Sequence, residues 1–166
     1  VRKATGSARG DVSERTQQFR QFWELLLERV RAEHPGWTRA RTTDQSWCDM
    51  SLGVAHVYVS LAFAGGALTA RIYFSSPDRA VNEARFDAVY RRRDEFEAAL
   101  GAQPEWDRMD GRKGARIAFI SHEFTDVADT DRWPQMVDWL IGKQIRLRAA
   151  FEAIGGAAVF DGAVEV

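Results

Sequence analysis

The sequence predicts an α+β domain in which an antiparallel β-sheet of about five strands packs against three helices in two layers, in the order α-β-β-β-α-β-β-α. Apolar residues recur at three- and four-residue spacing in three segments and alternate with polar residues in five others. Glycine-containing turns separate neighbouring alternating segments. Because each alternating strand has one apolar face, a layer of helices on that face is the arrangement that buries it.

Length and charge limit the possible functions. The chain has 166 residues, with 23 Lys and Arg against 24 Asp and Glu, and a net charge of −1. One core is expected, and any contact with nucleic acid must come from a local patch because there is no general attraction to polyanions. The single Cys48 excludes a disulfide framework and a Cys-rich zinc site. No stretch resembles a membrane helix or a signal peptide, so a cytoplasmic location is expected.

The domain is expected to span residues 13–154. Residues 1–12 have almost nothing to bury, so they are predicted to be a flexible tail or linker. Ser13 suits the N-cap of the first helix, and His34-Pro35-Gly36 is expected to end that helix. Residues 155–166 are predicted to form a C-terminal tail. The apolar stripe of the first helix consists of Phe19, Phe22, Trp23, Leu26, Leu27 and Val30.

Three strands are predicted after this helix. Residues 57–63 and 68–74 alternate between apolar and polar side chains. The glycines of Ala64-Gly65-Gly66-Ala67 suit a hairpin turn between them, because glycine reaches positive φ without steric cost. A shorter strand at 47–52 completes an antiparallel meander.

The second half of the chain is expected to add a helix, a hairpin and a final helix. The motif Ser75-Ser76-Pro77-Asp78 combines a serine cap, a first-turn proline and an acid, and the helix it begins should run to Gly101. Strands at 105–109 and 115–121 form the second hairpin. The last helix is expected to begin near Asp131.

No motif in the sequence assigns a catalytic residue, a metal ligand or a cofactor. No glycine loop joins a strand to a helix as a phosphate cradle requires, and the three histidines occupy different segments. Cys48 and His56 could meet across neighbouring strands as an activated thiol. However, Cys48 is flanked by Trp47 and Met50 in a predicted core strand, which favours a buried thiol. The Asp107 region is followed by no acid-x-lysine triplet, which argues against an intact nuclease site.

Aromatic and basic residues give a different prediction. If all helices pack on one sheet face, the other face presents rings and guanidinium groups from the strands. Several sheet-based modules hold single-stranded nucleic acid by stacking bases on such rings while cations neutralise phosphates. The same residue types also occur on the solvated face of ordinary antiparallel sheets. The candidate nucleic-acid-binding residues are Tyr58, Arg71, Tyr73, Arg112, Lys113 and Arg116.

Several segments together resemble the bacterial and archaeal domain of unknown function 4268, over about Ser13 to Phe151. The resemblance implies a domain that often follows a nuclease-like region at the C-terminal end of a longer protein, and it implies no catalytic residues. The segments are SERTQQFRQFWELLLERV, ARIYF, FDAVYRRRDEFEAALG, PEWDRMDGRKGARIAF and DRWPQMVDWLIGKQIRLRAAF.

Three functions follow, in order of preference. The first is a non-catalytic accessory module that gives a DNA-processing or defence protein its binding to nucleic acid, to a complex or to an upstream nuclease-like domain. The second is a protein-interaction or homodimerisation domain, since six Trp and ten Phe could leave aromatic surface for a partner. The third is an enzyme that uses Cys48 with His56, or the Asp107 region.

Overall fold

The structure, a computed structural model, describes residues 2–108 and 114–162, with side chains described from residue 13 onward. It confirms an α+β fold with a five-stranded antiparallel sheet, and its described residues form four α-helices rather than three. The elements are α1 (Arg2–Glu33), β1 (Trp47–Val54), β2 (Val57–Ala64), β3 (Ala67–Phe74), α2 (Arg79–Tyr90), α3 (Arg93–Leu100), β4 (Glu105–Asp107), β5 (Ala115–Ile120), the 3₁₀ turn η1 (Thr130–Arg132), α4 (Trp133–Ala153) and the 3₁₀ turn η2 (Gly156–Phe160).

The strands follow the order β1-β2-β3-β5-β4, and every neighbouring pair is antiparallel. The predicted hairpin between β2 and β3 is confirmed. Gly65 and Gly66 have φ of 60° and 76°, a conformation that side chains larger than glycine disfavour. In the second half of the sheet β5 pairs with β3, so the short strand β4 lies at one edge and β1 at the other.

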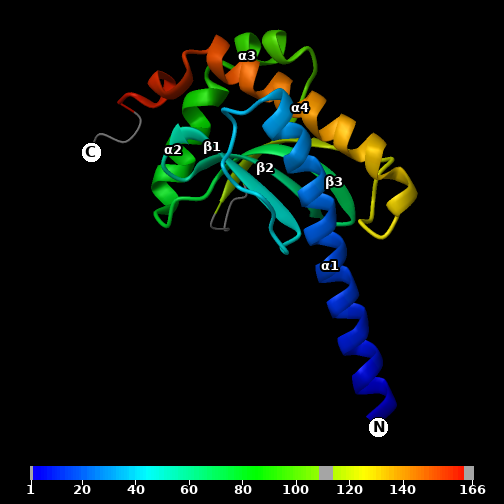
Figure 1. Ribbon diagram of the computed structural model, residues 1–166. Coiled ribbons are helices and arrows are strands. Elements are labelled where there is room, and N and C mark those ends of the chain that lie inside the picture. The colour runs from blue at the N-terminus through cyan, green and yellow to red at the C-terminus, as the bar shows by residue number, and fades with distance from the viewer. Residues whose placement is uncertain (1, 109–113, 163–166) are drawn as a thin grey trace.

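All four helices contribute to one layer on a single face of the sheet. Figure 1 shows α4 lying across the sheet and α1 leaning against it. The core contains strand residues such as Val59 and Ile72 together with helix residues such as Trp23 and Leu140. The side chains of Tyr58 and Tyr73, which point to the opposite side, lie outside this core. We call the sheet surface away from the helices the outer face.

The first helix is longer than expected. We predicted a tail up to residue 12 and a cap at Ser13, but α1 begins at Arg2, so Ser13 lies inside a continuous helix and does not cap it. Once the packed part of a helix is formed, each further residue adds one hydrogen bond, and a helix can therefore extend beyond its apolar stripe. The first turns of α1 project beyond the sheet (Figure 1).

The single helix predicted to end at Gly101 is divided into α2 and α3. Arg92 has φ −110° and ψ 26°, outside the helical range, and it separates the two helices. Its guanidinium donates to the carbonyl of Ile154 and to the carboxylate of Glu95. After this break the side chains of Phe96 and Leu100 are fully buried, and the apolar spacing that suggested one helix serves two.

The cap of α2 is Asp78 rather than a serine. Asp78 Oδ1 accepts a hydrogen bond from the backbone N–H of Ala80 at 3.0 Å. Ser76 contributes instead to the turn before the helix, where its Oγ accepts from the N–H of Asp78 at 3.1 Å and its backbone bonds the buried Asn82 amide. The proline at position 77 therefore precedes the cap.

The segment predicted as a C-terminal tail contributes to the core. Its turn η2 carries Phe160, which is 6% exposed. The Phe160 ring lies 6.0 Å from the ring of Phe74 and 5.8 Å from that of Phe151, measured between centroids. A single aromatic residue among small ones gave too weak a pattern for this packing to be predicted. Within residues 2–108 and 114–162, no helix is long and apolar enough to cross a membrane.

Candidate functional site

The outer face brings together the predicted residues that the structure describes. Tyr58 in β2 lies opposite Tyr73 in β3, and Tyr73 lies opposite Arg116 in β5. Arg71 follows the same side of β3, and its guanidinium carbon lies 4.6 Å from the centre of the Tyr73 ring. All four side chains are half-buried. Two other predicted residues, Arg112 and Lys113, lie outside the described residues.

The two described arginines of this face have different surroundings. Arg116 Nη2 lies 3.5 Å from a carboxylate oxygen of Glu105, and its Nε lies 3.5 Å from one of Asp107. The Asp107 contact is an ion pair without hydrogen-bond alignment, because Arg116 Nε is buried and has no hydrogen-bond partner among the described residues. Glu105 and Asp107 therefore both lie beside the Arg116 guanidinium as ion-pair partners.

A shallow depression of about 320 Å³ lies in the outer face beside Arg71. We call it the Ser60 depression, because Ser60, 1% exposed, lies between Asp49 on β1 and Arg71 on β3. The ring of Trp47, 45% exposed, lies at its rim. The depression is lined by Trp47, Asp49, Ser60, Arg71 and Tyr73.

Two polar atoms in this depression have no hydrogen-bond partner among residues 2–108 and 114–162. Ser60 Oγ and Arg71 Nε are both buried, and neither makes a hydrogen bond within the described part of the chain. Burial lowers the pKa of Arg71, an effect that Arg116 adds to and that Tyr73 and Asp49 oppose. A buried polar atom without a hydrogen bond destabilises the fold by about 1–3 kcal/mol, so a hydrogen bond from a ligand or water to either group would be favourable.

Gly114 sets the position of the Tyr73 ring. A Cβ built on Gly114 would lie 2.6 Å from Tyr73 Oη and 2.8 Å from Cζ. No real Cβ makes such contacts, so a side chain at position 114 would displace the tyrosine ring or the strand. The glycine before β5 therefore leaves room for the Tyr73 ring, which lines one side of the Ser60 depression.

The structure separates Cys48 from His56. Cys48 is 4% exposed and faces the core opposite Leu61, whereas His56 lies in the turn after β1 with φ 65°. The strand between them places the two residues roughly 20 Å apart. Cys48 and His56 therefore do not form an activated thiol. Within the described residues no three or more His, Cys, Asp or Glu side chains converge to hold a metal ion.

The buried thiol predicts a pH dependence of stability. Burial, with a smaller effect of Asp49, raises the pKa of Cys48 from 9.0 to about 12. Between these values the unfolded chain loses a proton that the folded chain keeps, so the free energy of unfolding falls as pH rises. From about pH 8 to about pH 10 we expect a loss of about 1.4 kcal/mol.

Urea denaturation of the wild type and of Cys48→Ala at both pH values measures this loss. Other groups titrate in both proteins, so the contribution of the thiol is the difference between the wild type and Cys48→Ala in how steeply the free energy of unfolding falls with pH. An equal fall in both proteins would show that the Cys48 thiolate is solvated in the folded chain. Thiol labelling should agree, with Cys48 unreactive at about pH 8 until urea unfolds the chain.

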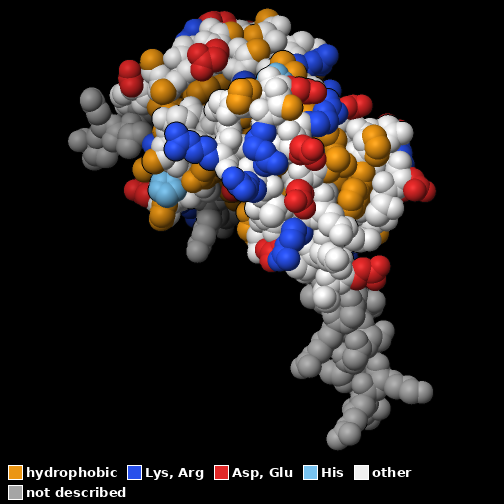
Figure 2. All heavy atoms as spheres, viewed as in Figure 1, with side chains coloured by type: hydrophobic (Ala, Val, Ile, Leu, Met, Phe, Trp, Pro, Cys, Tyr) orange, Lys and Arg blue, Asp and Glu red, His pale blue; other side chains and the backbone are white. Residues whose placement is uncertain are grey.

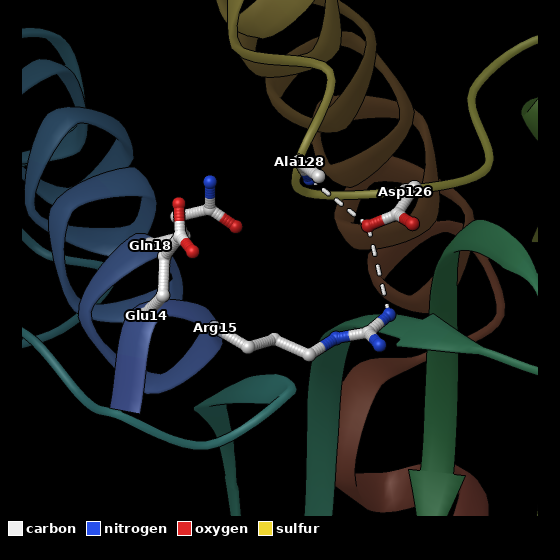
Figure 3. Close-up of a pocket in the computed structure, with 5 residues that line it drawn as sticks. All are labelled: Glu14, Arg15, Gln18, Asp126 and Ala128. Carbon is white, nitrogen blue, oxygen red and sulfur yellow. Dashed lines mark hydrogen bonds and ion pairs between the residues drawn. The ribbon is translucent and has the colours of Figure 1, made fainter. Parts of the chain in front are cut away.

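Another depression lies between α1 and the segment before α4, and Figure 3 shows Arg15 reaching across it toward Asp126. Arg15 Nη2 lies 3.5 Å from Asp126 Oδ1, which also accepts from the N–H of Ala128 at 2.9 Å. Both charged side chains are at least half exposed. The pair is therefore an ordinary surface ion pair, and its groups are already partnered.

Most of the chain matches one protein family. A family model described as "Domain of unknown function (DUF4268)" matches residues 19–154. The chain belongs to the DUF4268 family. No curated protein and no solved structure matches it. The matched range of the DUF4268 domain includes every residue of the Ser60 depression.

Three residues of the depression in this DUF4268 domain were not among the predicted site residues. Trp47 was expected to flank Cys48 in the core, but β1 alternates, and Trp47 and Asp49 point outward while Cys48 points inward. That alternation is visible in the sequence. The position of Ser60 between Asp49 and Arg71 depends on strand register, which the sequence pattern alone does not provide.

Proposed function

We propose that the outer face of this DUF4268 domain binds single-stranded nucleic acid, and that the domain is a non-catalytic accessory module of a protein that processes DNA. The observation that supports it is the Ser60 depression, where the exposed Trp47 ring and the half-buried Tyr73 ring lie beside buried donors that make no hydrogen bond among the described residues. The association with a nuclease-like region comes from the resemblance alone and remains a prediction.

The rings supply the sequence-independent part of the proposed binding. Trp47 is exposed at one strand, and Tyr58 and Tyr73 lie opposite each other on the next two. Sheet-based modules stack two or three bases on aromatic side chains arranged in this way. Each stacked base is worth about 1–3 kcal/mol, so this face could supply most of the affinity for a short segment.

Charge supplies a smaller part. Arg71 forms no ion pair with a carboxylate in the described part of the chain, while Arg116 is paired with Glu105 and Asp107. On the surface that Figure 2 shows, where α1 lies in front of the strands, Lys and Arg side chains are interspersed with Asp and Glu. Because few phosphates would be neutralised, we expect affinity to fall with salt, but with a shallow slope.

Replacing Trp47 with alanine should weaken binding of a single-stranded oligonucleotide by about tenfold, the loss of one stacked base. Fluorescence anisotropy of a labelled oligonucleotide at several salt concentrations measures the dissociation constant. Tyr90→Ala is the matched control, because Tyr90 is similarly exposed, at 40% against 45% for Trp47, but lies on α2 away from the outer face. Its affinity should equal that of the wild type.

Two results would count against this function. Absence of binding at low salt by both single-stranded DNA and RNA would remove the proposal entirely. Equal losses in Trp47→Ala and Tyr90→Ala would place the binding surface elsewhere. Circular dichroism melting of both variants ensures that neither result comes from unfolding.

A protein-interaction role is the second candidate, favoured by the position of β1. This eight-residue strand forms one edge of the sheet and carries the exposed Trp47. Edge strands can pair with another chain through their free N–H and C=O groups. Light scattering over a range of concentrations separates the two functions, since a strict monomer that binds oligonucleotides supports the first alone.

A further inference from the structure

The Ser60 depression combines acceptors and donors in a row across three strands. Asp49 pairs with Ser60, and Ser60 pairs with Arg71, so a carboxylate, a hydroxyl and a guanidinium follow one another across β1, β2 and β3. Neighbouring strands are about 4.8 Å apart, so the backbones of Asp49 and Arg71 are about 10 Å apart, a span across which one planar heterocycle can lie. The rings of Trp47 and Tyr73 also line the depression.

Arginine and aspartate select different atoms of a base. A guanidinium donates two parallel hydrogen bonds to the O6 and N7 acceptors of guanine, the commonest specific contact to a base. A carboxylate accepts from N–H groups, which guanine presents at N1 and N2. Adenine has an amino group where guanine has O6, so it cannot accept both bonds of an arginine.

We infer that the Ser60 depression binds one guanine base, with Asp49 accepting from the N1 and N2 N–H groups, Arg71 donating to O6 and N7, and the rings of Trp47 and Tyr73 flanking the base. Ser60 Oγ, which is buried and makes no hydrogen bond with any described residue, then gains a hydrogen bond from or to the bound base. This inference rests on the proposed function, because it names the base that the outer face selects.

Ion pairing distinguishes Arg71 from Arg116, the other described arginine of the outer face. Arg116, opposite Tyr73 in β5, has a carboxylate oxygen of Glu105 and one of Asp107 at 3.5 Å, although its Nε, like that of Arg71, makes no hydrogen bond among the described residues. Arg71 makes no ion pair with any described carboxylate, and its guanidinium is held against the Tyr73 ring. An arginine fixed by stacking is pre-organised for two-bond recognition, because less side-chain entropy is lost on binding.

The test uses thymine oligonucleotides that carry one central guanine, hypoxanthine, 7-deazaguanine or adenine, with affinity measured by anisotropy. Hypoxanthine lacks the N2 amino group and 7-deazaguanine lacks N7, so each should bind at least about fivefold more weakly than guanine. In Asp49→Asn the difference between guanine and hypoxanthine should disappear. Glu105→Gln, which changes a carboxylate of the same face outside the depression, should keep it.

The outcomes separate the two proposals. If all four oligonucleotides bind equally, the guanine site is wrong while the nucleic-acid function stands, and if none binds, both fail. Competition by free guanosine monophosphate distinguishes the source of the base. If free guanosine monophosphate displaces the labelled guanine oligonucleotide at a concentration equal to that of the unlabelled oligonucleotide, the site binds guanine but its assignment to nucleic acid is wrong. Loss of the guanine preference in Glu105→Gln as well as in Asp49→Asn would overturn the assignment of the carboxylate.

Discussion

Replacing Trp23 with alanine is expected to lower the free energy of unfolding by about 3–5 kcal/mol, the usual range for removing a large buried aromatic side chain. Trp23 is fully buried on α1, and its ring centre lies 5.0 Å from that of Phe22 and 6.0 Å from that of Phe63 on β2. Its indole N–H also donates to the carbonyl of Gln45 at 2.8 Å. One side chain therefore joins α1 to the sheet and to the connection that enters β1.

Urea denaturation followed by circular dichroism measures the loss. Leu25→Ala is the matched control, because Leu25 lies two residues away on the same helix and is 37% exposed, so its loss should stay near or below about 1 kcal/mol. Trp23→Phe should fall between the two, since it keeps a buried ring and loses the bond to Gln45. A loss in Trp23→Ala no larger than that in Leu25→Ala would show that α1 does not pack on the sheet.

The sequence was sufficient to predict most of the helices and strands. The apolar stripe from Phe19 to Val30 on α1 repeats with the helical period of 3.6 residues, and the alternation in β2 and β3 has the strand period of 2. Both patterns are clear because the apolar side chains of each element are buried on one side. The same alternation placed Tyr58 and Tyr73 on the face away from the core. Local patterns therefore carry the direction in which a side chain points, which is the part of the candidate site that could be predicted.

What could not be predicted depends on contacts between distant segments. The break at Arg92 accompanies a bond to Ile154, which is 62 residues away in the sequence. The packing of Phe160 requires the Phe74 ring from β3. The Ser60 depression likewise forms only when the register sets Asp49, Ser60 and Arg71 in one row, and a shift of one residue would turn Ser60 into the core.

Replacing Arg71 with methionine is expected to separate stability from binding. Methionine keeps much of the length and apolar surface of the arginine stem and removes a guanidinium whose buried Nε makes no hydrogen bond with the residues that the structure describes. The free energy of unfolding should therefore stay the same or rise by about 1 kcal/mol. Affinity for a single-stranded oligonucleotide should fall at least about tenfold, because the group aimed at the ligand is lost.

Arg116→Met is the control that gives the opposite pattern. Its Nε is also buried without a hydrogen-bond partner among the described residues, but its removal breaks the ion pairs with Glu105 and Asp107, so stability should fall by about 1 kcal/mol while affinity changes little. If Arg71→Met instead destabilised the domain and left affinity unchanged, the guanidinium would serve the fold through its contact with Tyr73. A residue that lowers the stability of the free domain but raises its affinity for a ligand is retained for binding. Arg71 and Arg116 test this difference within one sheet.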